Sequence, residues 1–292
     1  MFKFQETVSP NVVQVKIDFD SINDEQWLLL RGDCHHDHPK SDRDLEKKHL
    51  DEAKACGAGI IDVGDLFCAM QGKFDRRSSK SDIRPEHQSG DYLDALVRTA
   101  ADFYEPYAGN ILALGIGNHE VSIKDRHESC LTTRLAQTLR DRTGAAVPVT
   151  GYTGWIRIVI DYKGNRTSVV LWHHHGYGGG GPVTKDTIQS QRQQAYVDGA
   201  DIMVSGHVHE RWVQEHTKTG LTDLGEVKNR QVWYVKTGSY KDDFGTGRGG
   251  WQVGTGKPPK PLGGWWARLT VSRTTKNGKT TFKPIIEITP TT

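Results

Sequence analysis

The sequence predicts an α/β fold, built as a mixed sheet or two packed sheets with helices on the outside. Short apolar runs typical of buried strands recur along the chain, and segments with helical periodicity lie between them. Strands and helices that alternate in this way are typical of α/β domains. Three pairs of alternating segments also have the pattern of β-hairpins. The apolar runs are residues 28–30, 60–63, 111–114, 169–172 and 202–204.

Four segments have the pattern of helices. The first begins at Ser41, which with Asp44 three residues later resembles a capping box. It ends before Gly57, a residue type that suits the position after a helix. The other three helices are expected over residues 91–107, 128–142 and 186–197.

Three hairpins are expected later in the chain, and the last contains Asn277-Gly278, a strong signal for a two-residue turn. The paired segments are 155–161 with 167–172, 211–216 with 232–236, and 265–272 with 280–288. Without an internal repeat or a long linker, the chain is expected to form one domain over residues 1–292. Its parts are a motif core at 28–217, an exposed basic insert at about 71–88, a Gly- and Pro-rich loop at 245–264 and a C-terminal hairpin at 265–288.

The composition argues against a membrane protein and against a general affinity for polyanions. The net charge is +2, so no global field favours nucleic acid or a membrane surface. No segment has the apolar length that spans a bilayer, and the N-terminus lacks the apolar region of a signal peptide. Because Cys34, Cys56, Cys68 and Cys130 show no paired spacing, we expect free thiols in a reducing compartment, the cytoplasm.

Residues that commonly bind metals follow each of the five apolar runs. Ligands bind just beyond the carboxyl ends of buried strands in a sheet that is covered on both faces. We therefore expect these distant segments to meet at one rim and to form a two-metal hydrolase. The segments are Gly32-Asp33-Cys34-His35, Gly64-Asp65, Gly117-Asn118-His119-Glu120, His173-His174-His175-Gly176 and Gly206-His207-Val208-His209.

A two-metal centre needs a carboxylate that bridges the ions and further ligands on each side. Asp65 stands alone at its strand end and is expected to be the bridge. Asp33 and His35 are two residues apart in a segment that we expect to be extended, so their side chains should point the same way and share one ion. The same reasoning aims His207 and His209 together, each toward one of two adjacent ions.

The remaining candidates would complete the ligand set of the second ion and supply a proton to the leaving group. Asn118 offers a neutral amide oxygen, and one of the histidines 173–175 would be the last ligand. Such a set suits two ions of Mn, Fe or Zn, with a metal-bridging hydroxide as the nucleophile. His119 is expected beside the metals as the general acid for the leaving alkoxide, and Glu120 is expected to accept its ring N–H.

These motifs, in their order, resemble those of the calcineurin-like metallophosphoesterase superfamily and span residues 33–209. The resemblance implies a four-layer αββα sandwich with two mixed sheets and a dinuclear metal site. The family pattern of His directly before Gly favours His175 as the middle histidine. The implied ligands are Asp33, His35, Asp65 and His209 for one ion, and Asp65, Asn118, His175 and His207 for the other, with His119 catalytic.

The chain departs from the protein Ser/Thr phosphatase branch of that superfamily. The phosphate-clamping arginines of the branch are missing, because residues 66–69 read Leu-Phe-Cys-Ala and Gly115-Ile116 precede Gly117. This argues against phosphoprotein substrates. Many relatives also carry a second acid three residues after the Asp of the second motif, where this chain has Cys68.

Three functions follow from these observations. The first is a metal-dependent phosphoesterase, a hydrolase acting on a phosphodiester or a small phosphomonoester. The second is a DNA or RNA nuclease of the same superfamily, favoured by the basic insert and by Trp265-Trp266 but opposed by the near-neutral charge. The third is a metal-binding module without turnover. The expected partner is a phosphoester substrate, with nucleic acid as the alternative and no membrane.

Overall fold

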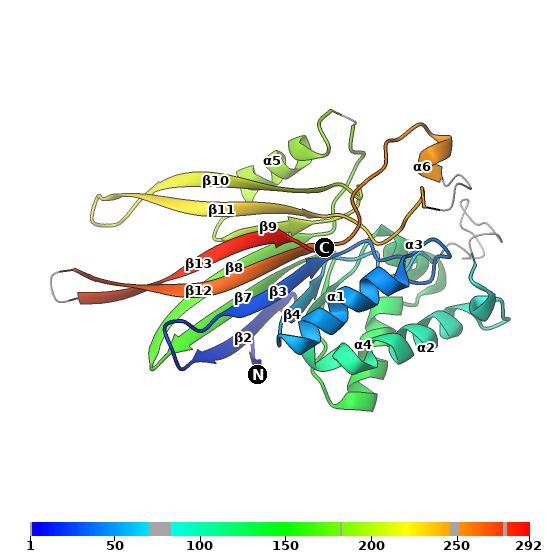
Figure 1. Ribbon diagram of the computed structural model, residues 1–292, viewed down its shortest axis with the longest axis horizontal. Coiled ribbons are helices and arrows are strands. Elements are labelled where there is room, and N and C mark those ends of the chain that lie inside the picture. Colours follow the sequence, from blue (N-terminus) through cyan, green and yellow to red (C-terminus); the bar gives the residue numbers. More distant parts are fainter. Residues whose placement is uncertain (1, 70–82, 182, 246–250, 277–278) are drawn as a thin grey trace.

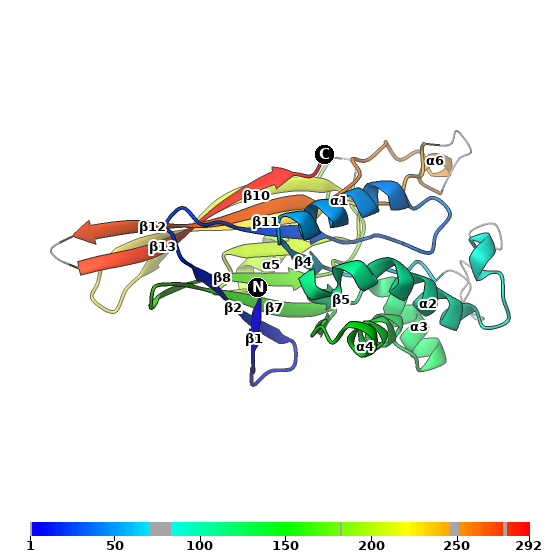
Figure 2. The same cartoon turned by 60° about the horizontal axis from the view of Figure 1, so that its bottom comes forward.

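Two β-sheets pack face to face in this computed structural model, with helices on the outer faces (Figures 1 and 2). The structure describes residues 2–69, 83–181, 183–245, 251–276 and 279–292. The predicted fold class, a mixed α/β fold of two mixed sheets flanked by helices, is confirmed. Residues 71–82 of the predicted basic insert and residues 246–250 of the Gly- and Pro-rich loop lie outside the described residues.

The first sheet contains the strands of the first three ligand segments, in the order β13-β12-β3-β4-β5-β6. Its centre is parallel, and β12 joins it antiparallel to β3. All three central strands are buried over the predicted apolar runs, as strands covered on both faces should be. The strands are β3 Gln26–Arg31, β4 Gly59–Asp62, β5 Ile111–Gly115, β6 Val149–Gly151, β12 Trp265–Lys276 and β13 Lys279–Pro290.

The second sheet contains the strands of the last two ligand segments, in the order β1-β2-β7-β8-β9-β11-β10. Strands β8, β9 and β11 run parallel, and β10 pairs antiparallel with β11. The prediction omitted β1 and β2, although alternate residues of β2 are buried as in a half-covered strand. The strands are β1 Lys3–Gln5, β2 Val12–Phe19, β7 Thr153–Tyr162, β8 Asn165–His174, β9 Ile202–Ser205, β10 Arg211–Leu221 and β11 Val227–Thr237.

Four helices lie close to the predicted ranges, and two further helices, α3 and α6, were not predicted. The described helices are α1 Arg43–Ala55, α2 Tyr92–Tyr104, α3 Asn118–His127, α4 Leu131–Thr143, α5 Thr187–Tyr196 and the single turn α6 Trp251–Gly254. Helix α3 was not predicted, and it begins inside the third ligand segment. No helix among the described residues has the length and apolar character needed to cross a membrane.

Three helix boundaries differ from the prediction for local reasons. The N-cap of α1 is Asp42, whose Oδ1 accepts the Leu45 N–H at 2.9 Å, and Ser41 instead donates to the Cys34 carbonyl. The capping box at Ser41 is therefore wrong. Helix α2 ends at Tyr104 because Pro106, two residues on, offers no N–H and favours the 3₁₀ turn Glu105–Asn110.

The boundary between α3 and α4 was predicted at the wrong residue. Glu128, the expected start of the third helix, has a left-handed backbone and ends α3 instead. Helix α4 then begins three residues later and ends at Gly144, also left-handed, as predicted.

Three apolar clusters hold the layers together. One lies between helices α1, α2 and α4 and the outer face of the first sheet, and includes Leu50, Leu96 and Leu135. The second fills the space between the two sheets. The third covers the outer face of the second sheet beside the segment that carries α5, and includes Trp172 and Met203. Helix, sheet, sheet and helix therefore follow one another as four layers.

Candidate metal centre

The five ligand segments meet where the carboxyl ends of strands from both sheets come together. The backbone N–H of Asp33 donates to the Gly64 carbonyl at 2.9 Å, and the N–H of Gly206 donates to the His175 carbonyl at 2.8 Å. The N–H of His207 donates to Asp33 Oδ2 at 2.8 Å, which connects the last segment to the first. The rim is therefore shared by two sheets rather than belonging to one.

Asp33, His35 and His209 form the first group of candidate ligands. Their ligand atoms all lie within 4.8 Å of one another. His35 Nε2 is 3.1 Å from His209 Nε2, and the latter atom is 3.4 Å from Asp33 Oδ1. Asp33 and His35 are buried, so the group has little solvent to compete with an ion.

Asp65, His175 and His207 form the second group, again with ligand atoms within 4.8 Å of one another. His175 Nε2 lies 3.2 Å from Asp65 Oδ2 and 3.1 Å from Asn118 Oδ1. His207 Nδ1 lies 2.8 Å from the same Asn118 oxygen. Asn118 therefore lies beside this group.

Only His175 of the three consecutive histidines enters the centre. His173 points into the core, where its Nε2 lies 2.6 Å from the Thr150 hydroxyl. His174 Nδ1 accepts the backbone N–H of Gly176 at 3.0 Å. Alternating side chains of β8 face opposite sides of the sheet, and the strand ends at His174. His175 is thus the first residue free to turn toward the rim.

Five of the seven candidate ligands have a left-handed backbone, so the argument that aimed Asp33 with His35 and His207 with His209 from extended segments was wrong. The φ angles are 51° at Asp33, 45° at His35, 53° at Asp65, 76° at His207 and 57° at His209. Each such residue costs about 1–2 kcal/mol relative to a right-handed conformation. Non-glycine residues in this region cluster at functional sites, where the turns aim side chains inward.

Two motif glycines are required because carboxylates lie directly against them. A Cβ at Gly117 would overlap Asp65 Oδ1, and a Cβ at Gly206 would overlap Asp33 Oδ2. Any larger residue at either position would push a candidate ligand out of the centre. Close packing against these carboxylates therefore explains why glycine precedes Asn118 and His207 in the sequence.

His119 lies beside the second group, at the beginning of α3. Its Nδ1 lies 2.6 Å from the Cys68 carbonyl oxygen and can only donate there, and its Nε2 is 3.9 Å from Asp65 Oδ2. The expected bond from this ring to Glu120 is wrong. The Glu120 carboxylate instead accepts the backbone N–H groups of Asp65, Phe67 and Gly117 at 3.1, 2.9 and 2.8 Å. Glu120 occupies the third position of α3, where a side chain reaches back to the N-cap.

The electrostatics of the centre favour a cation. Burial opposes the charged form of His175, but Asp65 and Asp33 outweigh burial and raise its pKa to about 9. Burial and repulsion from Asp65 likewise raise the pKa of Glu120 to about 8. Asp33 Oδ1 is buried without a hydrogen-bond partner among the described residues. Two carboxylates, an amide oxygen and several imidazoles are ligand types that could hold metal ions here.

A buried charged network behind the ligands was missed in the sequence analysis. Arg31 Nη1 lies 2.9 Å from Glu46 Oε1, and Arg31 Nε lies 3.0 Å from Asp62 Oδ2. His36 Nδ1 is 2.9 Å from Glu46 Oε2, and the Tyr104 hydroxyl donates to Glu46. All five side chains are buried, and they connect β3 and β4 to α1 and α2. The signal in the sequence was the charged residue at the end of each of two apolar strands, Arg31 in β3 and Asp62 in β4.

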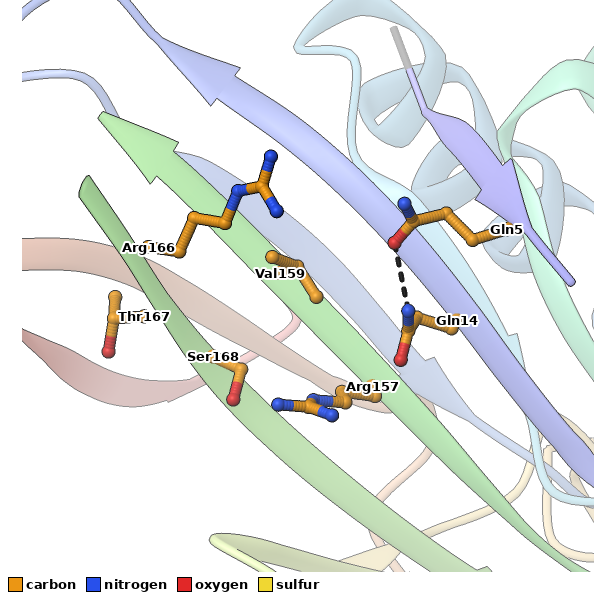
Figure 3. A pocket seen from close by; sticks show the side chains of 7 residues that line it. All are labelled: Gln5, Gln14, Arg157, Val159, Arg166, Thr167 and Ser168. Atoms are coloured by element: carbon orange, nitrogen blue, oxygen red, sulfur yellow. Dashed lines mark hydrogen bonds between the residues drawn. The ribbon is translucent and has the colours of Figure 1, made fainter. Parts of the chain in front are cut away.

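One pocket lies away from the centre, on the polar outer face of the second sheet (Figure 3). It has a volume of about 440 Å³, and its lining includes Arg157, Arg166, Gln5 and Gln14. Gln14 Nε2 donates to Gln5 Oε1 at 2.9 Å across it. None of the candidate ligands lines this pocket, so it adds nothing to the chemistry of the centre.

Comparisons with known proteins give only remote likenesses. No family model matches the chain, and no curated protein matches it. Vacuolar protein sorting 29 from Cryptosporidium parvum aligns at 13% identity over 90% of this chain and 98% of that chain, with a TM-score of 0.36. A conserved uncharacterized protein from Streptococcus pneumoniae TIGR4, a predicted phosphoesterase, aligns at 12% identity over 90% and 99%, with a TM-score of 0.32. The case for function therefore rests on the motifs and on the geometry of the centre.

Proposed function

We propose that this protein is a metal-dependent phosphoesterase that hydrolyses a phosphodiester or a small phosphomonoester at a dinuclear centre. The observation that carries the proposal is the meeting of two ligand groups at one rim, drawn from five distant segments. The order of those segments resembles the calcineurin-like metallophosphoesterases, which supports the same reaction class. The groups are Asp33, His35 and His209, and Asp65, His175 and His207 with Asn118 beside them.

Each group would hold one ion, and Asp65 would bridge the two. When bound, the ions supply Lewis-acid polarisation of the phosphoryl oxygens and activation of water at neutral pH. The protein contributes the fixed positions of the ligands. Asp65 is held by its Oδ1, which accepts the His119 N–H at 2.9 Å, and by Glu120, which accepts the Asp65 N–H. These bonds fix the carboxylate, whose Oδ2 lies 3.2 Å from His175 Nε2.

His119 is the proposed general acid for the leaving alkoxide. The bond from its Nδ1 to the Cys68 carbonyl fixes the ring, so that Nε2 is the atom left to deliver a proton. Its side chain is 14% exposed, which allows a substrate to approach. His119 therefore combines a fixed orientation with access to the reacting group.

The test of the function is hydrolysis of two chromogenic esters, bis(p-nitrophenyl) phosphate and p-nitrophenyl phosphate. We expect no turnover after the protein is stripped of metal and recovery when Mn²⁺ is added, because the ligand groups do no chemistry alone. The faster ester separates a diesterase from a monoesterase. Full activity of the stripped protein would contradict the proposal, and two bound ions without turnover would favour a binding module.

Replacement of His119 by alanine is expected to slow poor leaving groups far more than good ones. Loss of a general acid costs about 10²–10⁴ in rate when the leaving alkoxide needs a proton. Nitrophenolate leaves without one, so its release should change little. The measurement compares kcat of His119→Ala and wild type for an alkyl phosphodiester and for its nitrophenyl analogue. An equal loss on both esters would show that His119 acts in some other way.

Nuclease activity is the second candidate, and a different set of aromatic residues now favours it. Tyr177 and Tyr196 are 38% and 65% exposed, and their rings neighbour His174 and Trp172 at centroid distances of 5.9 and 6.4 Å. Exposed aromatic rings can stack bases, and Tyr177 precedes Gly178, whose carbonyl oxygen lies 2.9 Å from His207 Nε2. Retention on DNA at low salt that weakens as salt rises would support a nuclease.

The paired tryptophans give no support to nuclease activity. Trp265 is buried, and its Nε1 donates to the Lys236 carbonyl at 2.8 Å. Trp266 meets the ring of Trp27 edge-on at 6.4 Å and packs against the helix-side cluster. Both rings are thus occupied within the fold. Residues 71–82 of the basic insert lie outside the described residues.

A further inference from the structure

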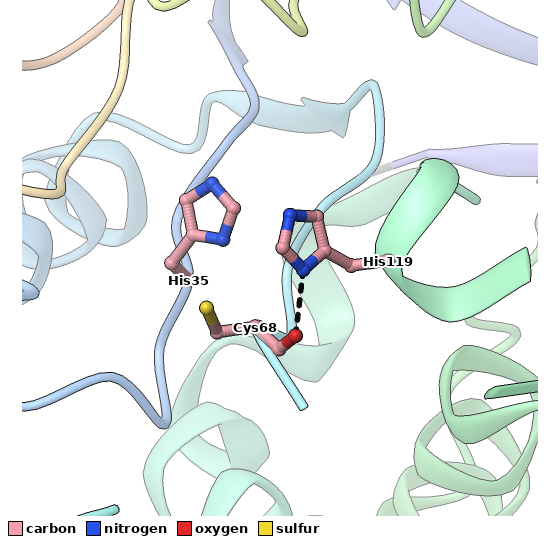
Figure 4. A group of neighbouring side chains, drawn as sticks. All are labelled: His35, Cys68 and His119. Carbon is pink, nitrogen blue, oxygen red and sulfur yellow. Dashed lines mark hydrogen bonds between the residues drawn. The ribbon is translucent and has the colours of Figure 1, made fainter. Parts of the chain in front are cut away.

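A third group of ligand atoms lies beside the proposed centre, and it includes a thiol. Cys68 Sγ, a ring nitrogen of His35 and a ring nitrogen of His119 all lie within 4.8 Å of one another. Figure 4 shows His35 and His119 on either side of a gap, with the Cys68 side chain below them. A thiol with two imidazoles is a donor set that Zn²⁺ and other soft ions prefer, whereas Mn²⁺ prefers oxygen.

The hydrogen bonds of the two histidines indicate which nitrogens would serve this group. His119 Nδ1 donates to the Cys68 carbonyl, so the lone pair of a neutral ring is on Nε2. His35 Nε2 faces His209 at 3.1 Å, whereas His35 Nδ1 is buried with no hydrogen-bond partner in the described part of the chain. His35 is only 2% exposed, so water gives that nitrogen little compensation. An unpaired buried nitrogen is costly, and an ion bound there would remove the cost.

The backbone that carries Cys68 is held in place. Asp37 accepts the Cys68 N–H on one carboxylate oxygen at 2.6 Å and the Ala69 N–H on the other at 2.9 Å. The side chains of Cys68 and Asp37 are both buried. The sulfur is therefore presented to the two imidazoles from a fixed loop, which lowers the entropic cost of assembling a three-ligand site.

We propose that His35, Cys68 and His119 form a separate site for one thiophilic divalent ion, such as Zn²⁺ or Cd²⁺, and that this ion inhibits the enzyme. On binding, the Cys68 thiol gives its proton to solvent and the sulfur forms a bond to the ion. Both imidazoles bind as neutral ligands, so the proton that His119 carries on Nε2 as the general acid also leaves for solvent. The inhibition rests on the proposed phosphoesterase function, but the binding does not.

The ion would inhibit because it occupies His35 and His119, which the proposed reaction needs. A neutral imidazole has one nitrogen lone pair, so His35 can serve this ion through Nδ1 or the Asp33 group through Nε2, but not both. His119 Nε2 is occupied by the ion and cannot deliver a proton. An excess of Mn²⁺ should therefore compete with the thiophilic ion by drawing His35 back to the Asp33 group.

The binding test is a Cd²⁺ titration of the full chain without substrate, followed by sulfur-to-cadmium charge-transfer absorption. Wild type should show the band at one equivalent, and Cys68→Ser and Cys68→Ala should lack it. Cys56→Ser removes an exposed thiol after α1 and should keep the band. His119→Ala retains the thiol but removes one ligand, so it should bind Cd²⁺ at least about tenfold more weakly. Loss of a residue that only hydrogen-bonds to a metal ligand already weakens metal binding by about that factor.

The inhibition test uses the Mn²⁺-loaded protein, with each rate divided by that variant's own rate without Cd²⁺. Cd²⁺ should inhibit wild type and Cys56→Ser, excess Mn²⁺ should reverse the inhibition, and both Cys68 variants should resist it. A wild type without the band, a band that persists in both Cys68 variants, or Cys68 variants inhibited as strongly as wild type would overturn the proposal. Because absorption needs no substrate, a Cys68-dependent band without turnover would contradict only the proposed function.

Discussion

Asp65→Asn is expected to lower Mn²⁺-supported hydrolysis by at least about 10³-fold, which corresponds to several kcal/mol of transition-state stabilisation. Asp65 is the carboxylate nearest to both His175 and His119, at 3.2 and 3.9 Å from their Nε2 atoms. Its Oδ1 also accepts the His119 backbone N–H. An amide keeps the size of the side chain but has one oxygen and no charge, so it cannot bridge two cations.

The measurement pairs the initial rate on bis(p-nitrophenyl) phosphate with the metal content of the purified protein. Asp223→Asn, in the exposed turn between β10 and β11, makes the same chemical change away from the centre and should retain the wild-type rate. A rate within about tenfold of wild type for Asp65→Asn, with two ions bound, would remove Asp65 from the bridging role.

Glu46→Ala is expected to have the largest effect on stability, a loss of about 3–5 kcal/mol in the free energy of unfolding. Glu46 is fully buried and is the partner of Arg31, His36 and Tyr104. Its removal leaves the Arg31 charge buried with only Asp62 beside it. Breaking one side of a buried ion pair is far more costly than losing an exposed pair.

Urea unfolding of both proteins measures this difference, and Lys47→Ala provides the matched control. Lys47 is the next residue on α1 and pairs with Asp51 on the exposed face, so its loss should cost less than about 1 kcal/mol. A Glu46→Ala protein as stable as Lys47→Ala would show that the buried network contributes little.

The ion pairs of Glu46 also predict how the stability difference between wild type and Glu46→Ala depends on pH. Burial opposes ionisation of Glu46, but the charges of His36 and Arg31 outweigh burial and lower its pKa to about 2. A carboxylate with a lowered pKa stabilises the fold above its unfolded pKa of 4.5, and that stabilisation is lost as pH falls toward the folded value. The stability difference between wild type and Glu46→Ala should therefore narrow between about pH 5 and pH 2.

The sequence predicted the ligand segments because their signals are local. A buried strand that ends at Gly and a metal-type ligand is visible within a few residues, as in Gly64-Asp65 after the apolar run at 60–63. The glycines are also visible in the sequence as part of these short segments. The reason that glycine is needed at 117 and 206 is a contact with a carboxylate oxygen from a distant segment.

Helix α3 and the role of Glu120 could not be predicted with the same reasoning. The third ligand segment is at once the end of a strand and the start of a helix, and the apolar pattern shows only the strand. Once Asn118 begins a helix, Glu120 turns back to the backbone and His119 bonds to Cys68 instead. That outcome depends on a contact between residues about fifty positions apart.

By itself, the sequence determined the strands that lead to the centre, the order of the ligand segments and the residue types available at each, since these follow from local hydrophobicity and turn chemistry. Only the tertiary structure decided that five ligands adopt left-handed turns, and it brought into the centre His175, which the family pattern had favoured over its two neighbours. It also decided that Cys68 faces His35 and that Arg31, Glu46 and Asp62 pair behind them. These outcomes depend on how the two sheets and their helices approach one another, and contact between distant segments leaves no pattern in a single sequence.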